Sequence, residues 1–171
     1  MRCTVLAALV LLALGSSLPP AARAVEPAAA VKADRVLVWK AKRKLYLLRD
    51  GRVLHRYRVA LGREPEGPKR REGDGRTPEG VYRLDWRNPD SRFHRSIHIS
   101  YPNEDEQARA ARRGVDPGGQ IMLHGLPDGL EGFEETHRRR DWTEGCIAVT
   151  NDEMDEIWAL VEDGTVIEIR P

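Results

Sequence analysis

Cysteine is scarce in this sequence, and the familiar zinc and serine-hydrolase motifs are missing. Only Cys3 and Cys146 occur in 171 residues, with no cysteine pair at the short spacing of a zinc site. There is no His-Glu-x-x-His segment, and His94 and His98 lie in a β-prone stretch where they would not meet as on a helix. The Gly-x-Ser-x-Gly turn of α/β-hydrolases is also absent. We therefore expect no metal and no other cofactor.

Long apolar runs are also scarce, and the one present is too short to span a membrane. It extends from Val5 to Leu14, whereas a bilayer-spanning helix needs about 20 apolar residues. Arg2 precedes the run and Ala-Arg-Ala at 22–24 follows it, as in a cleaved secretory signal peptide. We predict that residues through Ala24 are this signal, that the protein is exported to the periplasm or cell wall, and that no stable membrane insertion remains. An uncleaved membrane anchor is the alternative.

A strong net charge is absent as well. Without the predicted signal the chain keeps 26 basic and 27 acidic residues, so nucleic acid is not expected as a partner. Local basic runs at 40–44, 69–71 and 138–140 are most simply interpreted as solvated surface. Residues 25–33 form a short leader of mostly small residues, and residues 34–171 suffice for one domain with an ordinary core.

Loss of the signal would leave Cys146 as the one thiol of the exported chain. Secreted proteins normally pair their cysteines, and an unpaired thiol is at risk of oxidation in that compartment. A working role for Cys146 is therefore favoured over a purely structural one.

Short β-prone stretches alternate with turn signals over most of the chain. The clearest hairpin signal is Asp50-Gly51, because a type I′ turn needs positive φ at both central positions. One helix is predicted over 103–113, and another after Thr150, which forms a capping-box pattern with Glu153. The fold class is mainly β: a single domain of mixed β-sheets, a sandwich or half-open barrel, with one or two helices. Strands are predicted near 36–39, 45–49, 52–61, 81–86, 96–101, 120–124, 146–150 and 165–170.

Two short segments indicate acyl-transfer chemistry. In residues 143–146 (TEGC) the glycine permits a tight turn, and the backbone N–H groups of Gly145 and Cys146 are candidates to face a developing oxyanion. His124 ends a short apolar strand and is followed by Gly125. A neutral imidazole close to a thiol takes its proton and returns it to a leaving amine. We predict Cys146 as the nucleophile and His124 as its base, with a backbone carbonyl fixing the imidazole tautomer.

Taken together, the two segments resemble the L,D-transpeptidase catalytic (YkuD-type) domain, in which His-Gly is followed by Ser/Thr-x-Gly-Cys. Residues 74–82 (DGRTPEGVY) resemble that family's upstream glycine-rich loop and Thr-Pro-x-Gly turn, so the similarity extends from Asp34 to the C-terminus. The resemblance implies that Cys146 attacks a peptidoglycan stem peptide, with His124 as acid and base and the Gly125 carbonyl orienting the imidazole. It also implies a target bond between the third stem residue and D-Ala, followed by acyl transfer to an amine of another stem.

Two departures from the family pattern concern the substrate rather than the chemistry. Many members carry an arginine two residues after the cysteine, where this chain has Ala148, and residues 138–140 are the candidate replacement. The separation of 22 residues between His124 and Cys146 is longer than usual, which predicts an enlarged loop over the site at 126–140. Packing or turn roles are the alternative for the further predicted substrate contacts, which are Thr143, Trp142, Tyr101, His98 and Arg140.

Three functions remain open at this stage. The first, and favoured, is L,D-transpeptidation. The second is a cysteine hydrolase, a carboxypeptidase or amidase acting on stem peptides or protein–wall links, in which water replaces the acceptor amine. The third is a non-catalytic wall-binding module with a buried, inert thiol.

Overall fold

The computed structural model describes residues 31–130, 132–137 and 139–171. The predicted signal peptide at 1–24 and most of the predicted leader at 25–33 lie outside the described residues. Within the described ranges, no helix combines the length and the apolar character needed to cross a bilayer.

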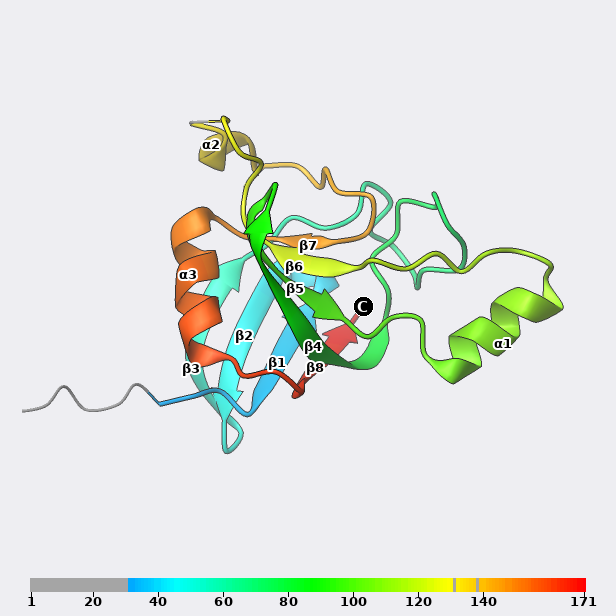
Figure 1. Ribbon diagram of the computed structural model, residues 1–171, viewed down its shortest axis with the longest axis horizontal. Helices are drawn as coiled ribbons and strands as arrows, with labels where there is room; N and C mark the ends of the chain where they lie inside the picture. Colours follow the sequence, from blue (N-terminus) through cyan, green and yellow to red (C-terminus); the bar gives the residue numbers. More distant parts are fainter. Residues whose placement is uncertain (1–30, 131, 138) are drawn as a thin grey trace, which may run out of the picture.

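One curled sheet of eight strands forms the body of the molecule (Figure 1). Its strand order is β3-β2-β1-β8-β4-β5-β6-β7, in which β1 with β8 and β6 with β7 are parallel and the other neighbours are antiparallel. The prediction of a mainly β, mixed-sheet domain is confirmed, and the half-open barrel describes it rather than a sandwich. The strands are β1 Arg35–Trp39, β2 Lys44–Arg49, β3 Arg52–Arg58, β4 Gly80–Ser91, β5 His94–Ile99, β6 Met122–His124, β7 Ile147–Ala148 and β8 Thr165–Arg170.

The β2–β3 hairpin forms where the sequence predicts it. Asp50 and Gly51 have φ angles of 49° and 74°, which places both turn residues in the left-handed region. The two strands continue in antiparallel register on either side of the turn. The turn residues therefore form as their sequence predicts, and the pairing shifts by one residue between Leu47 and Leu48.

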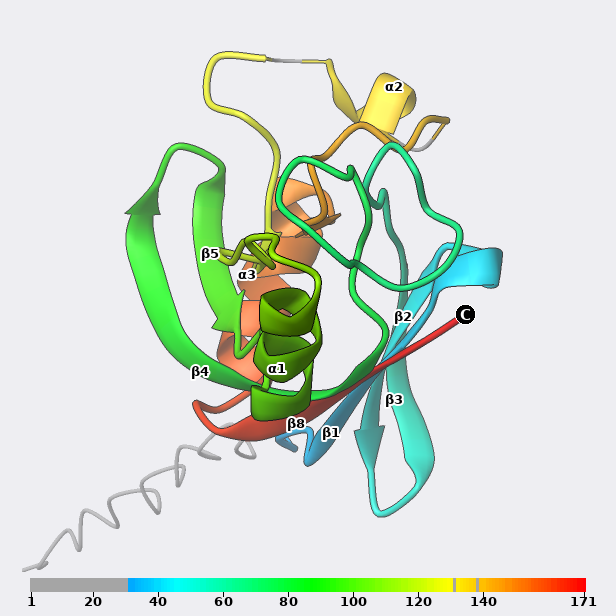
Figure 2. The ribbon, with the colours of Figure 1, turned by 90° about the vertical axis from the view of Figure 1, so that its right-hand side faces the viewer.

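The two principal helices begin at capping boxes. α3 (Asn151–Leu160) is capped by Thr150 with Glu153, as predicted. α1 (Glu104–Arg112) forms within the helix predicted over 103–113, and Asn103 caps it together with Glu106. The structure adds two shorter elements: a 3-10 turn, η1 (Lys40–Lys42), and a single helical turn, α2 (Glu134–His137), inside the predicted enlarged loop. Figure 2 shows α2 at the end of the molecule where this loop projects, well away from α1.

The core lies between α3 and one face of the curled sheet. Ile97 of β5, Leu123 of β6 and Ile147 of β7 are fully buried and share this core with Met154 and Ile157 of α3. Because side chains alternate across a strand, the neighbours of these three strand residues point to the opposite face. That opposite face of β5, β6 and β7 carries the candidate site.

Candidate active site

The short parallel pairing of β6 with β7 brings the two predicted catalytic residues to one place. Leu123 pairs with Ile147 and His124 with Ala148, so His124 and Cys146 project from the same face of adjacent strands. Both side chains line one cavity of about 350 Å³. Its wall comprises Ser91, Phe93, Ser96, Gln120, Met122, His124, Trp142, Thr143, Glu144 and Cys146.

The imidazole of His124 is fixed in one orientation. The residue is only 3% exposed, and Nδ1 lies 2.7 Å from the Gly125 carbonyl oxygen. Nδ1–H donates to that oxygen, which leaves Nε2 as an unprotonated acceptor. The rings of Phe93 and Trp142 lie 4.6 and 5.8 Å away. Burial lowers the pKa of His124 to about 4, against the opposing effect of the Gly125 hydrogen bond, so the ring is a neutral base throughout the neutral pH range.

Cys146 is half-buried, and its sulfur is contacted from β6. The Met122 N–H donates to Sγ at 3.4 Å, and the Gln120 carbonyl oxygen lies 3.7 Å from Sγ as an acceptor for its proton. Burial raises the pKa of the Cys146 thiol, while the Met122 N–H and the positive charge of Lys69 act in the opposite direction. The cavity therefore holds a neutral thiol and a neutral imidazole in the resting state.

Thr143 shapes the turn that presents the sulfur. Its hydroxyl donates to the Cys146 carbonyl oxygen at 2.8 Å and accepts from the Gly145 N–H at 3.1 Å. Thr143 is buried, and its own N–H donates to the Leu61 carbonyl. The hydroxyl thus has local backbone partners, and the Gly145 N–H, predicted as an oxyanion donor, is hydrogen-bonded to it in this state.

Glycine is required at both predicted motif positions because the chain passes too close for a side chain. A Cβ on Gly145, whose φ is 135°, would lie 2.6 Å from the Arg76 carbonyl oxygen. A Cβ on Gly125 would lie 2.6 Å from Asn151 Oδ1, which accepts from the Leu126 N–H. The first contact joins the TEGC turn to the long loop before β4.

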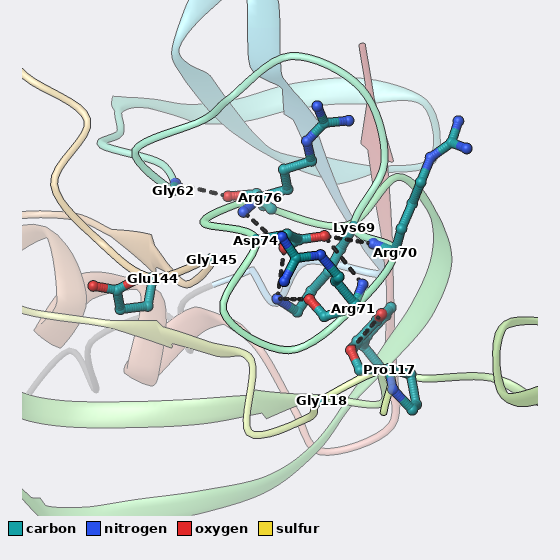
Figure 3. A network of polar contacts seen from close by, with 12 residues as sticks. Gly62, Lys69, Arg70, Arg71, Asp74, Arg76, Pro117, Gly118, Glu144 and Gly145 are labelled. Atoms are coloured by element: carbon teal, nitrogen blue, oxygen red, sulfur yellow. Dashed lines mark hydrogen bonds and ion pairs between the residues drawn. The ribbon is translucent and has the colours of Figure 1, made fainter. Parts of the chain in front are cut away.

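The loop at 62–79 is tied together by Asp74, which Figure 3 shows at its centre. The carboxylate accepts from the N–H groups of Arg70, Arg71 and Arg76 at 2.7, 3.1 and 3.1 Å, and from Lys69 Nζ at 2.9 Å. These bonds hold the loop in the shape that lets the Arg76 carbonyl meet Gly145. The predicted glycine-rich loop therefore packs as a fixed support against the turn that presents the nucleophile.

Two buried lysines in this region contradict the interpretation of their basic runs as solvated surface. Lys40 is 2% exposed and pairs with Glu79 at 2.8 Å, and the side chain of Lys69 is 3% exposed and pairs with Asp74. Sequence reasoning missed both because each lies among other basic residues. A buried lysine needs an acidic partner, which is Glu79 for Lys40 and Asp74 for Lys69. Asp74 lies only five positions after Lys69, and this spacing was the signal in the sequence that could have revealed the pair.

Of the remaining predicted substrate contacts, one lies in the cavity wall and the others lie outside it. Trp142 lines the cavity, where its ring packs near His124. Tyr101 is buried elsewhere and donates to the Pro117 carbonyl, and His98 lies on β5 against Asp85. Arg140 is exposed and does not belong to the cavity lining.

Arg139, on the same segment, pairs with Glu135 of α2, and Arg138 lies outside the described residues. The predicted replacement for the arginine of the family thus has no described member in the cavity wall. Among the residues that the structure describes, no group of three or more His, Cys, Asp or Glu side chains is placed to hold a metal ion.

The half-open barrel, with a histidine and a glycine-presented cysteine in one cavity, has the arrangement that the sequence motifs predicted. The sequence model of the L,D-transpeptidase catalytic (YkuD) domain matches residues 33–169, and the chain belongs to this family.

Individual relatives agree with this membership. YafK of Escherichia coli (strain K12), assigned to the L,D-transpeptidases, is 32% identical over 117 residues, which are 67% of this chain and 39% of YafK. The chain thus spans well under half the length of this curated relative.

Solved structures share the fold. The helical cell shape determining protein Pgp2 from Campylobacter jejuni superposes with a TM-score of 0.61 and 26% identity, covering 79% of this chain and 46% of Pgp2. Bd1075 from Bdellovibrio bacteriovorus gives a TM-score of 0.54 and 25% identity, covering 82% of this chain and 48% of that protein.

Proposed function

We propose that this protein is a peptidoglycan L,D-transpeptidase whose nucleophile is Cys146 and whose acid and base is His124. The observation that carries the proposal is the shared cavity: both side chains line it, and the Gly125 carbonyl holds the imidazole with Nε2 as acceptor. Family membership supplies the substrate class, the peptidoglycan stem peptide. The predicted export signal would place the enzyme in the periplasm or cell wall.

In the acylation half-reaction, Cys146 Sγ forms a bond to the carbonyl carbon of the third stem residue as its proton passes to His124 Nε2. The carbonyl oxygen becomes an oxyanion, for which the backbone N–H groups of Gly145 and Cys146 are the candidate donors. The Gly145 N–H exchanges its Thr143 partner for the oxyanion in this step. When the C–N bond breaks, the imidazolium gives its proton to the leaving amine of D-Ala, and a thioester remains on Cys146.

In the second half-reaction, His124 removes a proton from the acceptor amine as its nitrogen attacks the thioester. The C–S bond then breaks, and the proton returns to sulfur. The resting state with neutral thiol and neutral imidazole suits this cycle, because proton transfer accompanies attack rather than preceding it. The nearby Lys69 charge favours the thiolate as it develops.

The second candidate function is hydrolysis of the same thioester, and the size of the cavity favours it. A volume of about 350 Å³ is near the lower limit for a small-molecule pocket. It admits the end of one stem peptide, whereas a second stem must approach from outside. A water molecule is small enough to reach the thioester within this volume, which favours hydrolysis. A non-catalytic module is disfavoured because the sulfur is only half-buried and opens to this cavity.

Product analysis separates the two reactions. Purified disaccharide tetrapeptides are incubated with the protein, and the products are identified by mass spectrometry. Crosslinked dimers with release of D-Ala support transfer, and tripeptides without dimers support hydrolysis. Cys146→Ala is expected to abolish both products while keeping a wild-type melting temperature. Undiminished turnover by Cys146→Ala would refute the proposal.

A further inference from the structure

A bulge in β4 presents an exposed aromatic side chain on the same sheet face as the nucleophile. Leu84 pairs with Ile99 and Arg87 with Ile97, so Asp85 and Trp86 together stand opposite His98. A bulge of this kind redirects a side chain and is frequent beside active sites. Arg87 points to the helix side of the sheet, where its guanidinium donates to the Trp158 carbonyl. Trp86, its neighbour, is directed to the opposite face.

Trp86 and His98 form a flat, oriented pair. Their ring centroids lie 4.9 Å apart with planes 13° from parallel, and His98 Nδ1 lies 2.7 Å from Asp85 Oδ1. The carboxylate thus fixes the imidazole, and the imidazole supports the indole. Trp86 remains 42% exposed. This is a large apolar ring that is held rigid but is not covered by the core.

The other three tryptophans are partly exposed but differ from Trp86, and Trp142 packs among the rings of Phe93, His124 and Phe133. Lys42 lies 3.2 Å from the centroid of the Trp39 ring, and arginine side chains lie over Trp158. Within the described ranges, the one ring or cation packed on Trp86 is His98. With 42% of Trp86 exposed, part of the indole is open to a ligand.

The pair lies in line with the nucleophile across the sheet. His98 is the partner of Met122, and Met122 stands beside Cys146 because the next residues, Leu123 and Ile147, are partners. Three strand spacings of about 4.8 Å separate Trp86 from Cys146, roughly 14 Å in all. Met122 lines the catalytic cavity, so the surface is continuous from the sulfur towards the aromatic pair.

We propose that Trp86, His98 and Asp85 form a sugar-binding subsite for the glycan strand that carries the stem peptide. This inference rests on the proposed function. Three stem residues extended over about 3.3–3.6 Å each, with the link to the sugar, cover roughly the distance from Cys146 to Trp86. The C–H face of a pyranose packs on an indole, and its hydroxyls donate to a carboxylate such as Asp85. A stem peptide offers no comparable flat apolar group.

The test compares two donors that differ only in the sugar: a disaccharide tetrapeptide and the free tetrapeptide. Trp86→Ala is expected to raise KM for the disaccharide form by about twofold to twelvefold, from an aromatic contact of about 0.5–1.5 kcal/mol. It leaves kcat and the KM for the free tetrapeptide unchanged. Trp86→Phe keeps most of the wild-type preference. Val81→Ala, on the same strand at a residue 61% exposed, is the matched control and changes neither KM. Equal effects of Trp86→Ala on both donors, or no effect, would overturn the proposal.

A binding measurement keeps this test independent of turnover. In Cys146→Ala, titration with the peptide-free disaccharide at millimolar concentration is expected to shift the NMR signal of the Trp86 indole N–H, assigned through Trp86→Phe. No shift of this signal up to the highest disaccharide concentration that can be reached would contradict the subsite. If the wild-type protein processes neither donor, the proposed enzymatic function fails, while the titration still decides whether the aromatic pair binds sugar.

Discussion

Two long loops pack against segments that line the Cys146 cavity, the first against Gly145 and the second against Trp142, and they are held in opposite ways. The loop at 62–79 is anchored by the buried pairs Lys40–Glu79 and Lys69–Asp74, both shielded from solvent. The segment at 126–140 carries α2 and the pair Arg139–Glu135, whose side chains are 76% and 82% exposed. The first loop is therefore a preorganised support for the site, whereas the second is held by contacts that water weakens.

This contrast suggests a division of roles. The fixed loop meets the TEGC turn through the Arg76 carbonyl and so sets the position of the sulfur. The second loop contributes Phe133, whose ring lies 5.6 Å from that of Trp142 in the cavity wall. We expect the first loop to control chemistry and the second to influence which substrates enter.

The largest expected effect comes from breaking the anchored loop. Lys69→Met leaves the buried Asp74 carboxylate without its cation, and loss of one partner of a buried pair costs about 3–5 kcal/mol. We predict a destabilisation of about 3 kcal/mol, because three backbone N–H groups still serve Asp74, together with a lower kcat. Urea unfolding and turnover assays measure the two effects. Wild-type stability in Lys69→Met would contradict the anchoring role.

A comparable effect is expected from pH. The pKa of His124 is lowered to about 4 in the fold and returns to about 6.5 on unfolding, so the unfolded chain binds the extra proton between these values. Stability is fully present above pH 6.5 and falls as pH drops towards 4, by about 3 kcal/mol. Urea unfolding at pH 7 and pH 4.5, in wild type and His124→Gln, isolates this contribution. An identical pH dependence in both proteins would refute it.

A smaller effect on stability, but a clear one on rate, is expected at the contact between the fixed loop and the turn. Gly145→Ala places Cβ against the Arg76 carbonyl and forces a residue with a side chain to a φ of 135°. Backbone strain of this kind costs about 1–3 kcal/mol. We predict a loss of that size and a fall in kcat as the sulfur shifts. Gly129→Ala also has a positive φ but meets no atom within 4 Å, so it controls for strain alone.

The smallest effect is expected in the second loop. Arg139→Ala removes an exposed ion pair, which contributes about 0–1 kcal/mol. We predict a change in stability within about 0.5 kcal/mol and an unchanged kcat. A destabilisation matching that of Lys69→Met would show that the two loops are not held differently.

Local signals explain what the sequence could predict. The Asp50-Gly51 turn, the capping box of Thr150 with Glu153, and the two motif segments each depend on residues a few positions apart. The buried Lys40 could not be recognised in the same way, because Glu79 lies 39 positions later and becomes its neighbour only after the loop folds. The position of Trp86 depends on a bulge in the β4–β5 register, which local patterns do not determine.

The residues expected to contact substrate show the same limit. Trp142 lies in the cavity wall, because it directly precedes the TEGC turn. Tyr101 follows a strand whose neighbours reach the site, yet its hydroxyl is directed to Pro117. Proximity in sequence therefore predicted cavity membership only for the residue directly beside the motif.

The most direct test of the account is the mass of the intact protein after brief incubation with a disaccharide tetrapeptide or a carbapenem. We predict a single covalent adduct on the wild-type protein, located to Cys146 by peptide mapping. The adduct is absent in Cys146→Ala and forms about 100-fold more slowly in His124→Gln, in which the general base is lost. Adduct formation at the wild-type rate in either variant would contradict the assignment of a thiol nucleophile served by this imidazole.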